Sequence, residues 1–204
     1  MLAAGPALQQ ETRPAPLQAH DSGPPDETSN ERKRRFERSV LPHLNAAYNL
    51  ARWLTRNDHD AQDIVQDAML RAFRFFGSLR GEAKPWLLAI VRNACFTWLQ
   101  ANRPADTVAF NDGLAELLPS EDDGPEALAV RNYDRRMLNA AIGTLPAQFR
   151  EVLILRELED LSYKDIARIA DVPIGTVMSR LSRARRMLAE TLQASHPSRM
   201  QVHK

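Results

Sequence analysis

The sequence predicts an all-α protein made of two small helical domains. Its 204 residues are enough for two such domains, since domains commonly run from about 50 to 200 residues. Apolar residues make up 44% of the chain and charged residues 26%, which supplies material for cores. Helical periodicity lies on both sides of an acidic stretch, and no β-hairpin pattern or internal repeat interrupts it. We therefore expect two helical domains joined by a flexible acidic linker.

Residues 1–30 are predicted to be a disordered extension. They contain five prolines and no aromatic residue, so they bury too little apolar surface to offset the entropy of ordering. The extension could be a flexible arm, a regulatory segment, or the result of a start site placed too early.

Residues 31–103 are predicted to form the first helical domain, with breaks near 57–59 and 77–84. In the stretch 60–76, Leu70 lies in the middle of the polar face, where the core does not need it. It hints at a protein partner, although a single exposed leucine is common on any surface. The residues of the core-facing stripe are Ala61, Ile64, Val65, Ala68, Ala72 and Phe76.

Aromatic and cationic side chains alternate along residues 80–103. Rings interleaved with cations suit single-stranded nucleic acid, whose bases stack on them. The same stretch also reads as an ordinary core stripe of Trp86, Leu87, Ile90 and Ala94, and both interpretations stay open. The aromatic residues are Trp86, Phe96 and Trp98, and the cations are Arg80, Lys84, Arg92 and Arg103.

Residues 104–131 are predicted to be the acidic linker. Between Arg103 and Arg131 the chain has seven acidic residues, three prolines and no Lys or Arg. Helical periodicity then resumes over 132–192, with breaks near 143–146, 160–162 and 171–173 that divide it into four helices. Residues 193–204 are expected to be a tail.

The last two of these helices have the spacing of a helix-turn-helix. Ser162 and Asp165 form an N-cap pairing at the start of the first. Only Asp171 and Val172 separate it from Pro173, which suits the first turn of the next helix.

The final helix has an apolar face and a polar face. Short hydroxyls and arginines in its first turns are what a DNA major groove accommodates. Residues 161–192 are also locally basic, with six Lys or Arg against three acids, although the whole chain carries a net charge of +1. The alternative is a solvated charged face on an ordinary helical hairpin. The apolar face consists of Val177, Leu181, Ala184 and Leu188, and the polar face of Thr176, Ser179, Arg180 and Arg183.

Composition and motif content argue against several other classes of protein function. The single cysteine, Cys95, lies in an apolar run and favours a buried thiol over a redox sensor. No stretch is apolar enough to span a bilayer, so we expect a cytoplasmic protein. The five histidines lack metal-ligand spacing, and neither a phosphate loop nor a nucleophile elbow is present. We therefore expect no metal, no cofactor, no small-molecule substrate and no catalytic residues, which leaves little support for a small helical enzyme.

The chain resembles the extracytoplasmic-function (ECF) class of bacterial sigma factors over roughly residues 36–192. Sigma factors lend promoter specificity to RNA polymerase. The resemblance is carried by DAQDIVQD at 60–67, by PWLLAIVRN at 85–93 after Arg80 and Gly81, by LSYKDIA at 161–167 and by PIGTVMSRLSRAR at 173–185.

The resemblance implies three binding sites on this protein, one for RNA polymerase and two for promoter DNA. The first domain would bind the clamp helices of the largest polymerase subunit through Asp60, Asp63, Gln66, Asp67, Leu70 and Arg74. It would hold the melted -10 element through Arg80, Lys84, Trp86, Arg92 and Asn93. The second domain would read the -35 element through Ser162, Tyr163, Thr176, Ser179, Arg180, Arg183, Arg185 and Arg186.

The resemblance also implies an anti-sigma protein as a partner that holds the factor inactive. The basic run at 32–35 either contacts DNA phosphates or is a solvated helix start. The main rival is a conventional helix-turn-helix regulator that binds duplex DNA without polymerase. It leaves the first domain unexplained, because the chain has no alternating strand and helix pattern for a receiver domain.

Overall fold

The computed structural model describes residues 29–102 and 125–195, and the regular structure in these ranges is helical throughout, as predicted. Most of the predicted extension, most of the linker and most of the tail lie outside the described residues. Before the gap lie α1 (Ser29–Val40), η1 (Leu41–His43), α2 (Leu44–Thr55), α3 (Asp58–Arg74), η2 (Phe76–Ser78) and α4 (Ala83–Asn102). After it lie α5 (Pro125–Thr144), α6 (Ala147–Glu157), α7 (Tyr163–Ala170) and α8 (Ile174–Ser195).

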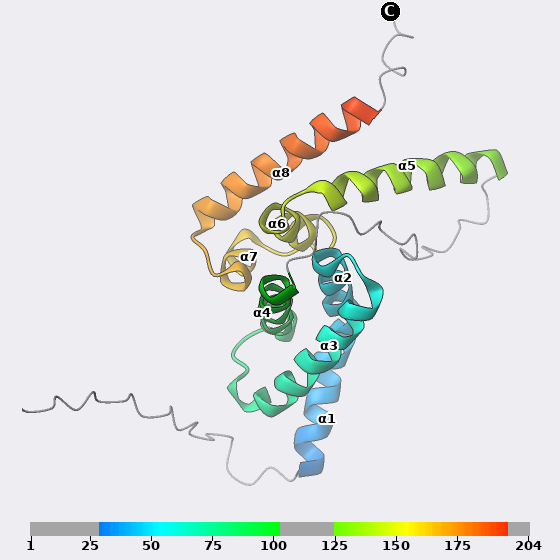
Figure 1. Ribbon diagram of the computed structural model, residues 1–204. Helices are drawn as coiled ribbons and strands as arrows, with labels where there is room; N and C mark the ends of the chain where they lie inside the picture. The colour runs from blue at the N-terminus through cyan, green and yellow to red at the C-terminus, as the bar shows by residue number, and fades with distance from the viewer. Residues whose placement is uncertain (1–28, 103–124, 196–204) are drawn as a thin grey trace, which may run out of the picture.

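The first domain packs α2, α3 and α4 against one another, with α1 extending from one end (Figure 1). The stripe predicted on 60–76 is confirmed, because all six of its residues are buried. Phe36 fixes α1 to this bundle by edge-to-face contacts with Phe73 at 5.2 Å and Phe76 at 5.4 Å between ring centroids. Cys95 is fully buried, as expected of a structural thiol.

The second domain packs α6, α7 and α8 together, and α5 lies along α8 (Figure 1). Val177, Leu181 and Ala184 form the buried face of α8, as their spacing predicts, and Leu188, the fourth predicted residue, is half-buried. The buried face of α7 consists of Ile166, Ile169 and Ala170, and Ala167 is half-buried.

The two domains are in direct contact. Helix α4 packs against α7, and α2 packs against α6, so one buried apolar cluster is continuous through both halves of the chain. In Figure 1, α4 lies at the centre of the molecule, below α6 and α7. This contact places the residues of α4 beside the second domain.

Three predicted boundaries differ from the structure. Helix α5 begins at Pro125, so the linker predicted to end at residue 131 is too long at its C-terminal end. Proline suits the first turn of a helix, where its missing N–H has no partner to lose, and the Ala and Leu that follow favour helix. Helix α1 begins at Ser29, within the predicted extension, and α8 continues to Ser195, into the predicted tail.

We predict that Asn57→Ala lowers the free energy of unfolding by about 1 kcal/mol. The Asn57 side chain caps α3 by accepting hydrogen bonds from the backbone N–H groups of His59 at 2.8 Å and Asp60 at 3.3 Å. Asn49→Ala on exposed α2 surface is the matched control and should be neutral or slightly stabilising, since alanine favours helix. Equal losses for both variants in urea unfolding would show that the cap is not what stabilises α3.

Candidate nucleic-acid and protein interface

Helices α7 and α8 form the predicted helix-turn-helix. Ser162 caps α7, its Oγ accepting a hydrogen bond from the backbone N–H of Asp165 at 3.1 Å. Asp171 ends the helix in the left-handed conformation, with φ of 53°. The carbonyl of Pro173 then accepts from the N–H groups of Thr176 and Val177 at 2.9 and 3.2 Å, so α8 begins directly after the proline. The turn is short and tight, as the motif requires.

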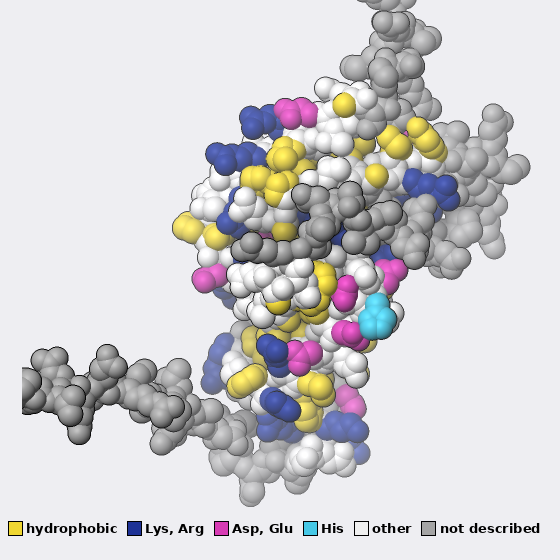
Figure 2. Space-filling view, viewed as in Figure 1, with side chains coloured by type: hydrophobic (Ala, Val, Ile, Leu, Met, Phe, Trp, Pro, Cys, Tyr) yellow, Lys and Arg dark blue, Asp and Glu magenta, His cyan; other side chains and the backbone are white. Residues whose placement is uncertain are grey.

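The polar face of α8 is accessible in most of its predicted positions. Figure 2 shows Lys and Arg side chains gathered along the α8 side of the molecule. Thr176 and Arg180 are half-buried, and the Arg185 guanidinium pairs with Glu157 at 2.7 Å. Exposed residues on this helix include Ser179, Arg183, Arg185 and Arg186.

Ser162 and Tyr163 are engaged within their own domain. The Ser162 hydroxyl makes the α7 cap and also bonds to the Asp165 carboxylate. Tyr163 is half-buried, and the Arg156 guanidinium lies over its ring at 5.5 Å from the centroid. These two predicted residues therefore support the start of α7, at the edge of the α8 face.

The predicted -10 residues divide into two groups. Arg80, on the loop before α4, and Asn93 are exposed. Lys84, Trp86 and Arg92 are half-buried, and both cations are turned toward the second domain. Lys84 Nζ lies 2.9 Å from Glu159 Oε2, and Arg92 Nε lies 2.7 Å from Glu151 Oε1.

Two adjacent charged residues of α6 are buried at this contact. Glu151 is fully inaccessible, and burial raises the pKa of its carboxyl while Arg92 and Arg180 oppose the shift. Arg150 donates to the carbonyl of Gly143 at 2.8 Å and to that of Leu54, in the first domain, at 3.4 Å. Burial lowers the pKa of Arg150 to about 10, so its guanidinium stays charged at neutral pH.

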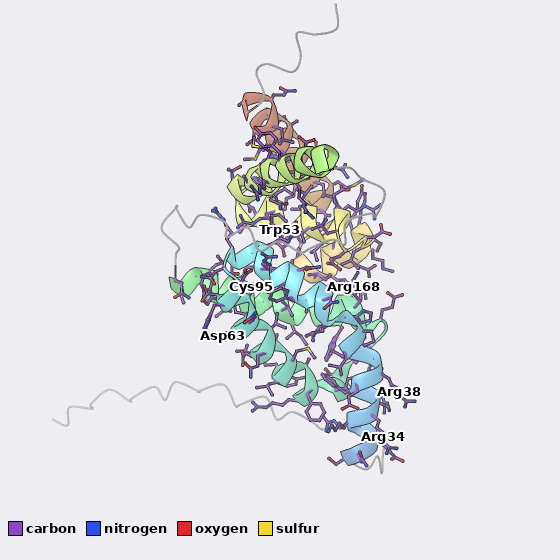
Figure 3. The ribbon with its side chains drawn as sticks, turned by 90° about the vertical axis from the view of Figure 1, so that its right-hand side faces the viewer. Arg34, Arg38, Trp53, Asp63, Cys95 and Arg168 are labelled. Carbon is purple, nitrogen blue, oxygen red and sulfur yellow. The ribbon has the colours of Figure 1, made fainter. Side chains whose placement is uncertain are left out.

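The predicted polymerase-binding face of α3 is exposed over most of its length, and Figure 3 shows Asp63 on the outside of this helix. Asp60 is half-buried, and Leu70 is 58% exposed. The six residues lie on one helix, with Asp63, Gln66, Asp67, Leu70 and Arg74 among the exposed positions.

An apolar groove of about 870 Å³ adjoins Leu70, between α1, the start of α2 and α3. It is lined by Leu41, Leu44, Met69 and Phe73 among others, and large apolar side chains remain partly exposed along it. Exposed apolar patches of this kind mark protein-protein contacts.

Sequence reasoning missed the groove and the burial of Glu151 and Glu159. The groove is lined by residues of α1, η1, α2 and α3, and the periodicity within one helix does not reveal which helices lie together. A weak signal for Glu151 was present, because Arg150 and Glu151 lie between Phe149 and the apolar run at 152–155. Charged residues are buried only with partners, so this pair could have indicated an interface.

Two family models match the chain. "Sigma-70 region 2" matches residues 40–104, and "Sigma-70, region 4" matches residues 135–188. The ECF RNA polymerase sigma-E factor of Haemophilus influenzae is 36% identical over 174 residues, covering 79% of this chain and 89% of the relative. The chain belongs to the ECF sigma factors. The resemblance inferred from its motifs is thus confirmed.

Other similar proteins agree with this family. The RNA polymerase sigma-H factor of Pseudomonas aeruginosa is 34% identical over 171 residues, covering 79% of this chain and 88% of the relative. Among solved structures, the sigma factor RpoE of Bartonella quintana, in complex with the anti-sigma factor NepR, superposes with a TM-score of 0.62. It is 27% identical and covers 80% of this chain and 99% of that one.

ECF sigma factors are transcription initiation factors, and the rival interpretation as a conventional regulator is not favoured. Family membership accounts for the first domain, which that rival left unexplained. In the described parts of this sigma factor, no helix has the length and apolar character needed to cross a membrane.

We predict that Asp165→Asn destabilises the protein at neutral pH and that the difference from wild type shrinks as the pH falls into the acidic range. Hydrogen bonding to Ser162, followed by the interactions with Arg168, lowers the pKa of Asp165. A carboxyl whose pKa is lower in the folded state stabilises it above the unfolded-state pKa of about 3.9 and loses that effect as pH falls through the folded pKa. Urea unfolding from pH 7 to pH 3 measures the difference, and a constant difference would contradict the role of the charge.

Proposed function

We propose that this sigma factor binds core RNA polymerase through α3 and its adjoining groove and directs initiation by reading two promoter elements. The observation that carries the proposal is the pairing of this partly apolar face in the first domain with a basic helix-turn-helix in the second. The first surface suits a protein and the second a polyanion, and a promoter-specificity subunit needs both. The protein itself has no catalytic role in this proposal.

The polymerase-binding assignment rests on Asp63, Gln66, Asp67, Leu70 and Arg74, which share an exposed helix face. Leu70 projects among charged groups next to the groove, so it can serve as an apolar anchor surrounded by polar contacts. Asp60, at the start of the same helix, is half-buried and would lie at the edge of the contact.

The -35 assignment rests on α8. Arginine can pair with guanine O6 and N7 in the major groove, hydroxyls can bond to bases or phosphates, and the outer arginines can contact phosphates. The base-reading candidates are Thr176, Ser179, Arg180 and Arg183, and the phosphate candidates are Arg185 and Arg186, with Ser162 and Tyr163 at the edge of the surface.

The -10 assignment rests on α4 and the loop before it. Arg92 lies over the Phe96 ring at 4.2 Å from its centroid, so a cation and an aromatic face lie together, as in sites for single strands. Flipping a base from the duplex costs a few kcal/mol, which favours easily melted sequences. The proposed contacts are Arg80, Lys84, Trp86, Arg92 and Asn93.

We further infer an anti-sigma protein as regulator. The similar sigma factor of Bartonella quintana was solved in complex with one. By this proposal the sigma factor works in the cytoplasm, where its polymerase and promoters are.

Run-off transcription with purified core RNA polymerase, with and without this protein, tests the proposal on a library of upstream DNA fragments. We expect protein-dependent transcripts that start at defined positions and share two upstream elements. No transcripts, together with tight duplex binding by the protein alone, would overturn the proposal in favour of a conventional regulator.

We predict that Leu70→Asp abolishes co-purification with core polymerase and run-off activity without loss of helicity. The substitution places a charge in an apolar contact but leaves the core intact, since Leu70 is exposed. Leu158→Asp, at an equally exposed leucine in the second domain, is the matched control and should still bind core polymerase. Loss of circular dichroism signal in Leu70→Asp would instead make Leu70 part of the fold.

We predict that Arg180→Ala costs about 1 to 3 kcal/mol in binding at the -35 element and relaxes selectivity there, as expected for a lost bidentate base contact. Run-off transcription on promoters with single -35 substitutions measures the effect. Arg38→Ala, which removes an exposed arginine from α1, is the control and should keep full discrimination. Unchanged selectivity in Arg180→Ala would show that the recognition face is misplaced.

A further inference from the structure

The first two turns of α8 expose two large apolar side chains. Ile174 is 47% exposed and Met178 is 54% exposed. They are four residues apart in one helix, so they lie on the same side of it, one turn after the other. The buried face of α8 consists of Val177, Leu181 and Ala184 instead. Packing among the residues that the structure describes therefore accounts for neither exposed side chain.

The surroundings of this apolar pair suit a polyanion. Ser179 follows Met178 directly, Arg183 and Arg186 project from the next turns, and all three are exposed. In Figure 1 the start of α8 lies at the edge of the molecule, beside α7. Duplex DNA complements these cations, whereas an apolar protein surface would have to desolvate them. The pair adjoins the proposed -35 contacts, so the inference rests on the proposed function.

Gly175 leaves the surface between the two apolar side chains open. A Cβ added to this glycine would meet no atom of the described residues within 4 Å, and its backbone lacks the positive φ that favours glycine. Alanine also favours helix more than glycine does. The fold thus supplies no reason for a glycine at this position, whereas the close approach of a ligand to the start of α8 does.

We propose that Met178, with Ile174 beside it, reads the 5-methyl group of a thymine in the -35 element. This methyl is the one large apolar group that base pairs present in the major groove, where the other recognition groups are hydrogen-bond donors and acceptors. A donor or acceptor placed against the Met178 side chain would lose water without gaining a hydrogen bond. The contact therefore selects thymine without a hydrogen bond and adds to the reading by Ser179 and Arg180.

The test replaces single thymines of the -35 element, on either strand, by deoxyuridine. This base lacks the 5-methyl group but keeps every hydrogen-bonding group of thymine. The full-length protein is assembled with core RNA polymerase, and its affinity for synthetic duplexes of a promoter found by run-off transcription is measured by competition. We expect one such replacement to lower the affinity of the wild type about fourfold, the contribution of one buried methyl group.

We predict that Met178→Ala abolishes this loss and binds the thymine and deoxyuridine duplexes equally well. Its preferences at the other -35 positions should remain, which shows that α8 still docks. Met178→Leu keeps an apolar side chain of similar size and should retain most of the loss. Leu138→Ala, which truncates an exposed leucine of α5, is the matched control and should show the full wild-type loss.

Gly175→Ala separates a role in folding from a contact with DNA. The added Cβ meets open space and favours helix, so urea unfolding should show equal or higher stability than in the wild type. The same Cβ enters the space that the duplex occupies, so promoter affinity should fall several-fold. Unchanged affinity would overturn the close approach of DNA to the start of α8 and the methyl contact with it.

Two further results would overturn the inference while the proposed function stands. The first is a -35 element in which no replacement of thymine by deoxyuridine lowers the affinity. The second is an equal loss in the wild type and in Met178→Ala. Absence of promoter-specific transcripts with the wild type would instead overturn the proposed function, and the methyl contact with it.

Discussion

Burial of the Glu151 carboxylate is the constraint on which the arrangement of the two domains depends. A carboxylate without access to water needs a cation, and here Arg92 of the first domain supplies it at 2.7 Å. Arg150, the preceding residue, reaches the carbonyl of Leu54 in the same domain. Two adjacent residues of α6 thus bind different helices of the first domain: Arg150 binds a carbonyl of α2, and Glu151 binds a cation of α4. Together these contacts fix how α6 lies against α2 and α4. Apolar packing alone would restrict that geometry less, because it has no direction.

Local features of the fold could be predicted from the sequence, and long-range ones could not. The α3 stripe and the α8 core face follow from helical spacing, and the Ser162 cap involves residues three positions apart, so each signal lies within one helix. Glu151 meets Arg92 across 59 positions of sequence. A charged residue beside an apolar run indicates that a partner exists if the residue is buried, without saying which cation that partner is. The groove beside Leu70 was missed for the same reason, since residues of α1, η1, α2 and α3 line it.

The two surfaces proposed to bind polymerase and promoter DNA differ in their physical chemistry, which suits two kinds of partner. The groove and Leu70 present apolar area, whose burial depends little on salt. The α8 face presents arginines, and binding of cations to DNA releases counter-ions and weakens steeply as salt rises. Under the proposed function, polymerase binding through the first surface would therefore persist while contacts with promoter DNA form and break. A specificity subunit benefits from this division, because it must stay on polymerase while different DNA sequences are sampled.

The Glu151 carboxylate is shared by two of the proposed DNA contacts. Arg92 of α4 pairs with it at 2.7 Å, and Arg180 of α8 opposes the effect of burial on its pKa. Under the proposed function, a phosphate that drew Arg92 away would leave the buried charge of Glu151 to Arg180 alone and would strengthen the attraction between these two residues. The Arg180 side chain would then be less free to reach a base, so this shared counter-ion would oppose simultaneous contacts with both promoter elements rather than favour them.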